Sequence, residues 1–218
     1  MDRVLEPELM DGEEQSIAYA QADFSDSNQW YVEHLIDEFS GHLQKVIDIG
    51  CGPADVDIRI ARIKPDIEII AVDGSEQMIK IAQQAVKGAE FEQLIMPKLG
   101  YIPGLPISQH TFDAILSKDL LHHLPDPSVL WNEAKRLGKS GAAIYVMDLF
   151  RPRTQEDARQ IVEKVAANGP TILKQDFFNS LCAAFTSEEV EEQLRAAGLR
   201  LQVAKVSERH MLIKGTLP

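Results

Sequence analysis

Cysteine and long apolar runs are scarce in this chain of 218 residues. The two cysteines, Cys51 and Cys182, cannot make a disulfide framework, and neither lies at a paired metal-ligand spacing. The longest uninterrupted apolar run, AAIYVM at 142–147, is far too short to span a bilayer, and the N-terminus is acidic where a secretion signal is basic. We therefore expect a cytoplasmic protein with no membrane partner.

Basic residues are also in short supply. Lysine and arginine number 22 against 34 acids, which leaves a formal net charge of −12. Tracking a phosphate backbone takes clustered positive charge, so we expect no nucleic-acid partner. Hydrophobic residues make up 44% of the chain, enough to bury one core, and the length predicts a single domain over 1–218.

Short apolar strands alternate with helical segments after about residue 45. Strands are predicted at 45–50, 68–74, 112–117, 141–150, 199–206 and 208–218. Helices are predicted at 28–40, between the first two strands, from Ser75 to Lys87, from Pro127 to Gly138, and after the capping boxes that begin at Thr154 and Thr186.

This order of elements predicts an α/β fold with a Rossmann-like, doubly wound and mostly parallel sheet. Its strands are continuously apolar, which is typical of a sheet with helices on both faces. The last two strands are close enough in sequence to form an antiparallel hairpin. Ligands of such sheets bind beyond the carboxyl ends of the strands, so the ends near residues 50, 73 and 117 are the places to search.

The first strand end reads VIDIGCGPAD, residues 46–55. Gly50 and Gly52 allow a close backbone approach. Asp48 lies in a buried strand, where an unpaired charge costs several kcal/mol. It either serves a ligand or holds the N–H groups of its own loop, and both interpretations stay open. Asp73, 23 residues beyond Gly50, lies near the distance at which a nucleotide-binding βαβ unit offers an acid to a ribose, which favours a nucleoside ligand.

The type of nucleoside follows from the end of the glycine motif. A dinucleotide fingerprint needs a third glycine where this chain has Asp55, and a carboxylate there would repel phosphate but suit a sulfonium group. The stretch DIGCGPA resembles the D-x-G-C-G-x-G motif of the class I S-adenosylmethionine-dependent methyltransferases, with Ala54 in place of the last glycine. The resemblance covers roughly 28–150 at motif level and continues in topology to the C-terminal hairpin.

The resemblance implies S-adenosylmethionine as cofactor, S-adenosylhomocysteine as product, and a seven-stranded sheet. Asp73 would bind the ribose hydroxyls, and Tyr101 takes the place of an acid that contacts adenine in many relatives, where its ring offers stacking instead. The implied cofactor-binding residues are Asp48, Gly50, Cys51, Gly52, Pro53, Asp55, Asp73, Gly74, Ser75, Met78, Tyr101, Ser117 and Lys118.

The third strand end, SKDLLHHLPDP at 117–127, resembles the fourth motif of the same family. The resemblance implies that Asp119 faces the reacting methyl group. His122 and His123 are candidates to take a proton from the acceptor, because imidazole titrates near neutral pH. For either histidine a packing role is the alternative. No acids or cysteines repeat at ligand intervals around them, so no metal site is predicted.

Substrate contacts are expected from segments outside these motifs. Arginines after the strand at 141–150 are candidates for a substrate carboxylate, or they pair with the chain's many acids. These arginines are Arg151 and Arg153. Arg209 and His210 in the final hairpin are weaker candidates of the same kind. The predicted substrate-binding residues are Tyr19, Tyr31, Arg151, Asp176 and Asn179, with helix packing as the alternative role for Tyr31.

The predicted function is transfer of a methyl group to a small-molecule acceptor by in-line displacement. A nicotinamide-dependent oxidoreductase and a non-catalytic S-adenosylmethionine-binding protein are the alternatives. Within one domain we expect an N-terminal lid and helix over 1–44, a cofactor-binding core over 45–150, substrate-side helices over 151–198 and a hairpin over 199–218. The oligomeric state is not predicted.

Overall fold

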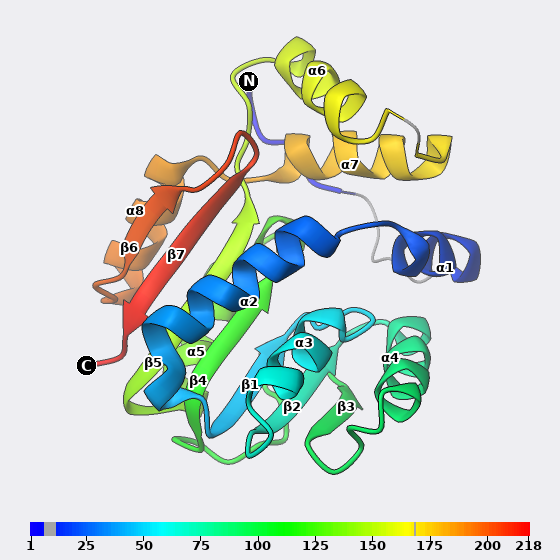
Figure 1. Ribbon diagram of the computed structural model, residues 1–218. Coiled ribbons are helices and arrows are strands. Elements are labelled where there is room, and N and C mark those ends of the chain that lie inside the picture. Colours follow the sequence, from blue (N-terminus) through cyan, green and yellow to red (C-terminus); the bar gives the residue numbers. More distant parts are fainter. Residues whose placement is uncertain (7–11, 168) are drawn as a thin grey trace.

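A seven-stranded sheet forms the centre of the computed structural model, which describes residues 1–6, 12–167 and 169–218 (Figure 1). The strand order is β3-β2-β1-β4-β5-β7-β6; β7 runs antiparallel to both of its neighbours, and the other pairs are parallel. The strands are β1 Lys45–Ile49, β2 Glu68–Asp73, β3 Ile95–Leu99, β4 Phe112–Lys118, β5 Gly138–Leu149, β6 Gln202–Lys205 and β7 His210–Thr216. The predicted fold class is confirmed.

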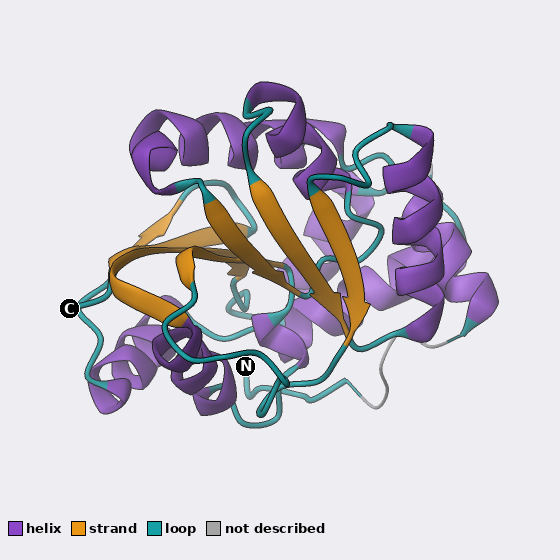
Figure 2. Cartoon of the chain, turned by 90° about the horizontal axis from the view of Figure 1, so that it is seen from below, coloured by secondary structure: helices purple, strands orange, loops and turns teal. Residues whose placement is uncertain are grey.

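Helices cover both faces of the sheet, as the view in Figure 2 shows. The α-helices are α1 Glu13–Gln21, α2 Ser25–Phe39, α3 Asp55–Ile63, α4 Glu76–Gly88, α5 Ser128–Leu137, α6 Gln155–Val165, α7 Thr171–Ala183 and α8 Ser187–Ala197. Two 3₁₀ turns are also present, η1 Ser40–His42 and η2 Leu121–His123.

Alternating side chains of the central strands supply two separate cores. On one face, Val46 of β1 packs in a cluster with the apolar sides of α2, α3 and α4. On the other face, Ile47 packs in a cluster with α5 and α8. Both faces of β1 are therefore buried, which explains why its sequence is continuously apolar rather than alternating.

Helices α6 and α7 lie beyond the carboxyl ends of the strands, with their own small apolar cluster around Leu149, Val162 and Leu181 (Figure 1). The N-terminal segment, residues 1–6, is tied to this part of the molecule. The Met1 ammonium donates to the Arg153 carbonyl at 2.7 Å, and the Val4 N–H donates to the Cys182 carbonyl at 3.0 Å. This arrangement brings the start of the chain beside the site-bearing end of the sheet.

Several predicted element boundaries differ from the structure. Strand β3 was not predicted from its own pattern, because this edge strand contains Pro97 and exposes Met96. Strand β5 begins at Gly138, where a helix end was predicted, and α5 begins one residue after Pro127. The capping boxes of α6 and α8 are confirmed. No helix in the described ranges is long and apolar enough to cross a membrane.

Candidate active site

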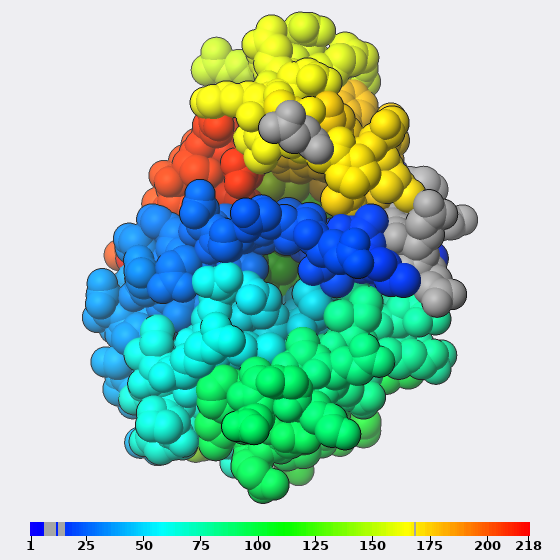
Figure 3. All heavy atoms as spheres, turned by 45° about the vertical axis from the view of Figure 1, so that its right-hand side comes forward, coloured from blue at the N-terminus to red at the C-terminus, as the bar shows by residue number. Residues whose placement is uncertain are grey.

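A cavity of about 900 Å³ lies beyond the carboxyl ends of β1, β2 and β4. Its wall comes from the strand ends, from the N-terminal segment with α1, from η2, and from α6 and α7. Figure 3 shows the surface hollowed between the N-terminal helices, in blue, and the α6–α7 pair, in yellow. This is the sheet edge at which the sequence predicts a ligand.

The loop after β1 forms one wall of the cavity through its backbone. Gly50 and Gly52 have φ angles of 84° and 52°, in the left-handed region that favours glycine. A β-carbon on Gly50 would lie 2.9 Å from Cβ of Leu120, so the loop passes the segment after β4 at a distance that only glycine permits. Ala54, in the place of the motif's last glycine, has a φ of 64°, the same left-handed conformation.

Asp73 joins this loop to the start of α4. Its carboxylate accepts one hydrogen bond from the Gly52 N–H, at 2.9 Å, and another from the Ser75 N–H, at 2.8 Å. Ser75 in turn caps α4 by accepting from the Met78 N–H at 3.2 Å. Tyr101 stands next to them, since a β-carbon on Gly74 would lie 3.0 Å from its ring. The acid, the cap and the aromatic ring therefore share one end of the cavity.

Most of the predicted site residues line this cavity. They are Gly50, Gly52, Asp73, Gly74, Ser75, Met78, Tyr101 and Lys118 among the cofactor candidates, Asp119, His122 and His123 among the catalytic candidates, and Tyr19 and Asp176 among the substrate candidates. The weaker candidates Arg209 and His210 line it too. The predicted residues that do not line it are Asp48, Cys51, Pro53, Asp55, Ser117, Tyr31, Arg151 and Asn179.

Asp55 faces α2 instead of the ligand. Its carboxylate accepts from Asn28 Nδ2 at 2.8 Å and pairs with Arg59 Nε at 2.7 Å, one turn along α3. Asp55 is therefore engaged with α2 and α3 and does not line the cavity. Its assignment as a cofactor ligand stays a prediction.

Asp48 lies beneath the cavity floor, 3% exposed. Asp57 of α3 is fully buried near it, and neither of the Asp57 carboxylate oxygens has a hydrogen-bond partner in the part of the chain that the structure describes. Burial raises the pKa of Asp57 well above its ordinary value, and the nearby Asp48 raises it further. Both acids are therefore buried beneath the cofactor loop and do not line the cavity.

Two predicted substrate contacts are structural residues. Tyr31 is 0% exposed, and its hydroxyl donates to the Tyr145 carbonyl at 2.9 Å. The Arg151 guanidinium pairs with Glu189 at 2.6 Å and donates to the carbonyls of Met1 and Ala184. The packing and acid-pairing alternatives hold for these residues. Asn179 accepts from Gln175, one turn away on α7, and Ser117 donates to the Ile49 carbonyl.

His122 forms a buried pair with Asp148, which lies near the end of β5. His122 Nδ1 lies 2.8 Å from Asp148 Oδ1, and Asp148 Oδ2 accepts from the Leu121 N–H at 2.6 Å. Burial lowers the pKa of His122, but the carboxylates of Asp148, Glu6 and Asp119 together outweigh burial and bring that pKa above its ordinary value. Asp148 therefore fixes the ring of His122 at the cavity wall.

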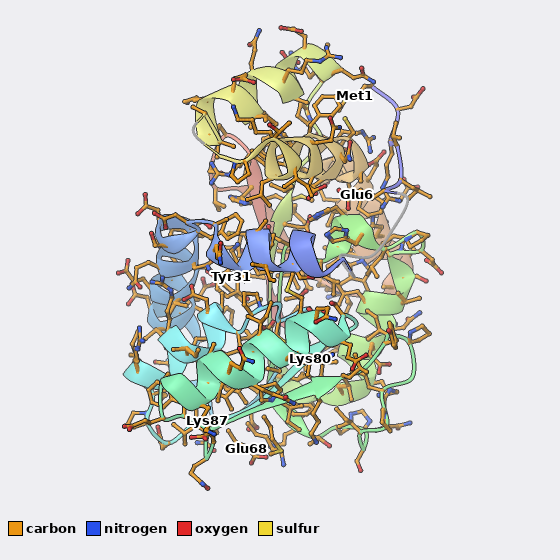
Figure 4. The ribbon with its side chains drawn as sticks, turned by 90° about the vertical axis from the view of Figure 1, so that its right-hand side faces the viewer. Met1, Glu6, Tyr31, Glu68, Lys80 and Lys87 are labelled. Carbon is orange, nitrogen blue, oxygen red and sulfur yellow. The ribbon has the colours of Figure 1, made fainter. Side chains whose placement is uncertain are left out.

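His123 forms the second pair, with Glu6 of the N-terminal segment. Its Nδ1 lies 2.6 Å from Glu6 Oε2, and Ser180 of α7 donates to Glu6 Oε1 at 2.6 Å. The two imidazole rings lie side by side, with their centroids 4.1 Å apart. Figure 4 shows Glu6 between α7 and the segment after β4. The neighbouring histidines thus face the same region of the cavity.

Asp119 follows β4 directly and lines the cavity. It has a φ of 57°, which is strained for a residue with a β-carbon, and such strain concentrates at functional sites. One of its oxygens pairs with Lys118, and the other lies 3.6 Å from His210 Nε2. Burial raises the pKa of Asp119, but Lys118, His210 and His122 together outweigh burial and bring that pKa to about 2. Asp119 is therefore a weak base.

Sequence reasoning missed Glu6 and Asp148. The argument from burial that singled out Asp48 also applies to Asp148. It is a charged residue near the end of a buried apolar strand, where it needs a partner. Glu6 carries no such signal, because nothing in the acidic N-terminal sequence links it to residues that follow β4.

Comparison with known proteins shows the family of the chain. Residues 41–198 match the profile of a family described as a methyltransferase domain. The chain belongs to this family. The match confirms the resemblance to class I S-adenosylmethionine-dependent methyltransferases, and with it S-adenosylmethionine as the cofactor.

The chain is also similar to individual members of the family. It is 31% identical to a demethylmenaquinone methyltransferase of Bacillus cytotoxicus over 118 residues, 54% of this chain and 49% of that protein. It is 23% identical to 27-O-demethylrifamycin SV methyltransferase of Amycolatopsis mediterranei over 78% of this chain and 61% of that protein. A solved methyltransferase structure from Aquifex aeolicus has the same fold, with a TM-score of 0.70 at 19% identity over 93% of this chain and 98% of that one. The chain thus spans about half the length of the first of these relatives.

Proposed function

We propose that this chain transfers the methyl group of S-adenosylmethionine to a small-molecule acceptor. The observation that carries the proposal is the cavity itself, where the glycine loop, Asp73 and the α4 cap stand at one end and a histidine cluster at the other. The cavity volume of about 900 Å³ suits a cofactor and a modest acceptor together. The curated relatives act on small molecules, as their names state.

The cofactor occupies the end formed by β1, β2 and α4. Asp73 accepts hydrogen bonds from the ribose hydroxyls, and its bonds to Gly52 and Ser75 hold it in place for that role. Gly50, Gly52 and Lys118 border the methionine part, while Gly74, Ser75, Met78 and Tyr101 surround the adenine. Because Tyr101 is 57% exposed, its ring is free to stack on the base at the rim.

The acceptor occupies the end formed by η2, α1 and α7. Its nucleophilic atom attacks the methyl group opposite the sulfur; a bond to the methyl carbon forms as the sulfur–carbon bond breaks, and S-adenosylhomocysteine leaves. Alignment and exclusion of water supply most of the acceleration, and proximity alone contributes about 7–11 kcal/mol. His122 and His123 face the acceptor and handle its proton, while Tyr19 and Asp176 contribute to its binding.

The four segments have separate tasks in this proposal. Residues 1–44 contribute a lid and Tyr19 on the acceptor side, and residues 45–150 bind the cofactor. Residues 151–198 cover the acceptor, and residues 199–218 complete the sheet. All four segments belong to one domain. A cytoplasmic location fits the scarcity of cysteine.

Calorimetric titration of the purified protein with S-adenosylmethionine and, separately, with a nicotinamide dinucleotide tests the cofactor. We expect micromolar binding of the first and none of the second; the reverse would replace the proposal with the oxidoreductase. Transfer of labelled methyl groups to fractions of a metabolite extract then tests catalysis. Binding without any transfer would favour the non-catalytic alternative.

A further inference from the structure

Three metal-ligating side chains meet on the acceptor side of the cavity. Glu6, His122 and His123 each offer a ligand atom, and these atoms lie within 4.8 Å of one another. The histidines are neighbours on η2, while Glu6 comes from the N-terminal segment. We propose that Glu6, His122 and His123 form a binding site for a divalent first-row transition ion. The inference rests on the proposed function only for the ion's role, not for its binding.

The partners around this cluster are those that metal ligands need. Asp148 accepts from His122 at Nδ1, which leaves the other ring nitrogen, Nε2, with its lone pair for an ion. Ser180 holds Glu6 Oε1, which leaves Oε2 on the side of His123. Carboxylate and hydroxyl groups in this outer position orient ligands and raise their basicity. His122 and Glu6 are thus held by their surroundings before any ion arrives, and the His123 ring is held by its pair with Glu6.

The backbone beneath the histidines is equally constrained. Arg3 donates to the carbonyls of His122 and Leu124, both at 2.9 Å, and its guanidinium lies 3.8 Å from the ring centre of Phe185. Asp148 holds the Leu121 N–H. Because Arg3 and Glu6 belong to the same segment, the contacts that position the histidines also position their carboxylate partner.

The donor set selects the kind of ion. Two imidazole nitrogens and one carboxylate oxygen suit zinc and its first-row neighbours, whereas magnesium and calcium prefer oxygen ligands only. Three protein ligands leave coordination positions open, as in catalytic zinc sites. All three residues line the cavity, so the open positions face the place of the acceptor.

An ion at this site has a direct use in methyl transfer. It would bind a hydroxyl oxygen of the acceptor and lower the pKa of that hydroxyl, so the proton leaves to water. With the ion bound, His122 and His123 act on that proton through the ion instead of accepting it themselves. The oxygen then forms the new bond to the methyl carbon while the sulfur–carbon bond breaks. The inference therefore narrows the acceptor to a small molecule that offers a hydroxyl oxygen to a cation.

Zinc titration tests the site directly. Protein without a histidine tag is dialysed against a chelator and titrated with zinc chloride by calorimetry, and cobalt chloride reports the coordination sphere by its visible absorption. We expect one ion per chain and a higher melting temperature with zinc. Glu6→Gln and His123→Ala should each weaken zinc binding at least tenfold. His34→Ala, which removes an exposed histidine of α2, should leave it unchanged.

Binding of S-adenosylmethionine, measured on the same samples, separates the two proposals. If the wild type binds no stoichiometric zinc, or if Glu6→Gln and His123→Ala both bind it as the wild type does, the metal site is rejected, while cofactor binding keeps the proposed function. Zinc binding without cofactor binding rejects the function and leaves the site. Glu6→Gln is nearly isosteric and keeps an acceptor for Ser180, so it provides a folded variant even if His123→Ala proves unstable.

Discussion

The two ends of the cavity are built in different ways. Most of the cofactor end comes from residues 50–78, where backbone N–H groups, two glycines and one acid follow each other closely along the chain, and Tyr101 and Lys118 complete it. The acceptor end comes from the N-terminal segment, η2, β5 and α7, and its side chains work in pairs: His122 with Asp148, and His123 with Glu6. One end is local in sequence and the other is assembled.

This difference predicts how each end fails. A change at the cofactor end should alter ligand affinity and leave most of the fold intact, because the loop depends on its own backbone. A change at the acceptor end should destabilise the protein, because its charged groups are buried and each depends on a partner from another segment. The following variants test this contrast in order of decreasing effect.

Asp148→Asn should be the most costly change. Asp148 is 1% exposed and accepts from both His122 and the Leu121 N–H. Removing its charge leaves a buried histidine without its partner, at a cost of about 3 kcal/mol. Urea unfolding measures the loss, with the exposed Asp66→Asn as the matched control. Equal stability of the two variants would contradict the assembled character of the acceptor end.

Gly50→Ala should damage both ends at once. Its new β-carbon would lie 2.9 Å from Cβ of Leu120 and would sit at a φ of 84°, so crowding and backbone strain together should cost about 2–3 kcal/mol. Gly104→Ala is the control, because Gly104 has a φ of 95° but nothing within 4 Å. The control should lose about 1 kcal/mol from strain alone. Similar melting temperatures would show that contact with Leu120 does not matter.

Asp73→Ala should weaken S-adenosylmethionine binding by roughly 10- to 100-fold, since hydrogen bonds to a charged group contribute about 1.5–3 kcal/mol. Asp55→Ala is the informative control. Sequence reasoning makes Asp55 a ligand, whereas the structure pairs it with Asn28 and Arg59, so its removal should change the dissociation constant by no more than about twofold. Calorimetric titration with S-adenosylmethionine measures both dissociation constants. A larger loss of affinity in Asp55→Ala than in Asp73→Ala would support Asp55 as the ligand that the sequence predicts.

Asp57→Asn should stabilise the protein by about 1 kcal/mol at pH 8 and by less at pH 5. The pKa of Asp57 is raised in the folded protein, so the folded state keeps a proton that the unfolded chain releases above about pH 4. Stability therefore falls as pH rises from that value towards the raised pKa, and asparagine removes this dependence. The melting temperatures of the wild type and of Asp57→Asn are measured from pH 5 to pH 8. The advantage of the variant should grow with pH, and a difference that stays constant would contradict the raised pKa of Asp57.

The cofactor end could be predicted because its signals are local. Gly50, Gly52 and Asp73 were identified from spacing and from the ends of two strands, and the structure brings them together. The pairing of Asp55 could not be predicted for a tertiary reason: its carboxylate meets α2, which supplies Asn28 as its partner. The edge strand β3 was missed because it carries Pro97 and exposes three of its five residues, so it lacks the apolar run that marks the central strands.

The sequence by itself determined the alternation of strands and helices, the dry faces of the sheet and the glycine bend, since these depend on periodicity and on backbone angles that neighbouring residues set. Only the tertiary structure decided which acids pair with His122 and His123. Asp148 and Glu6 reach them from a distant strand and from the start of the chain, and side chains so far apart in sequence meet only when the sheet edge and the N-terminal segment are packed together.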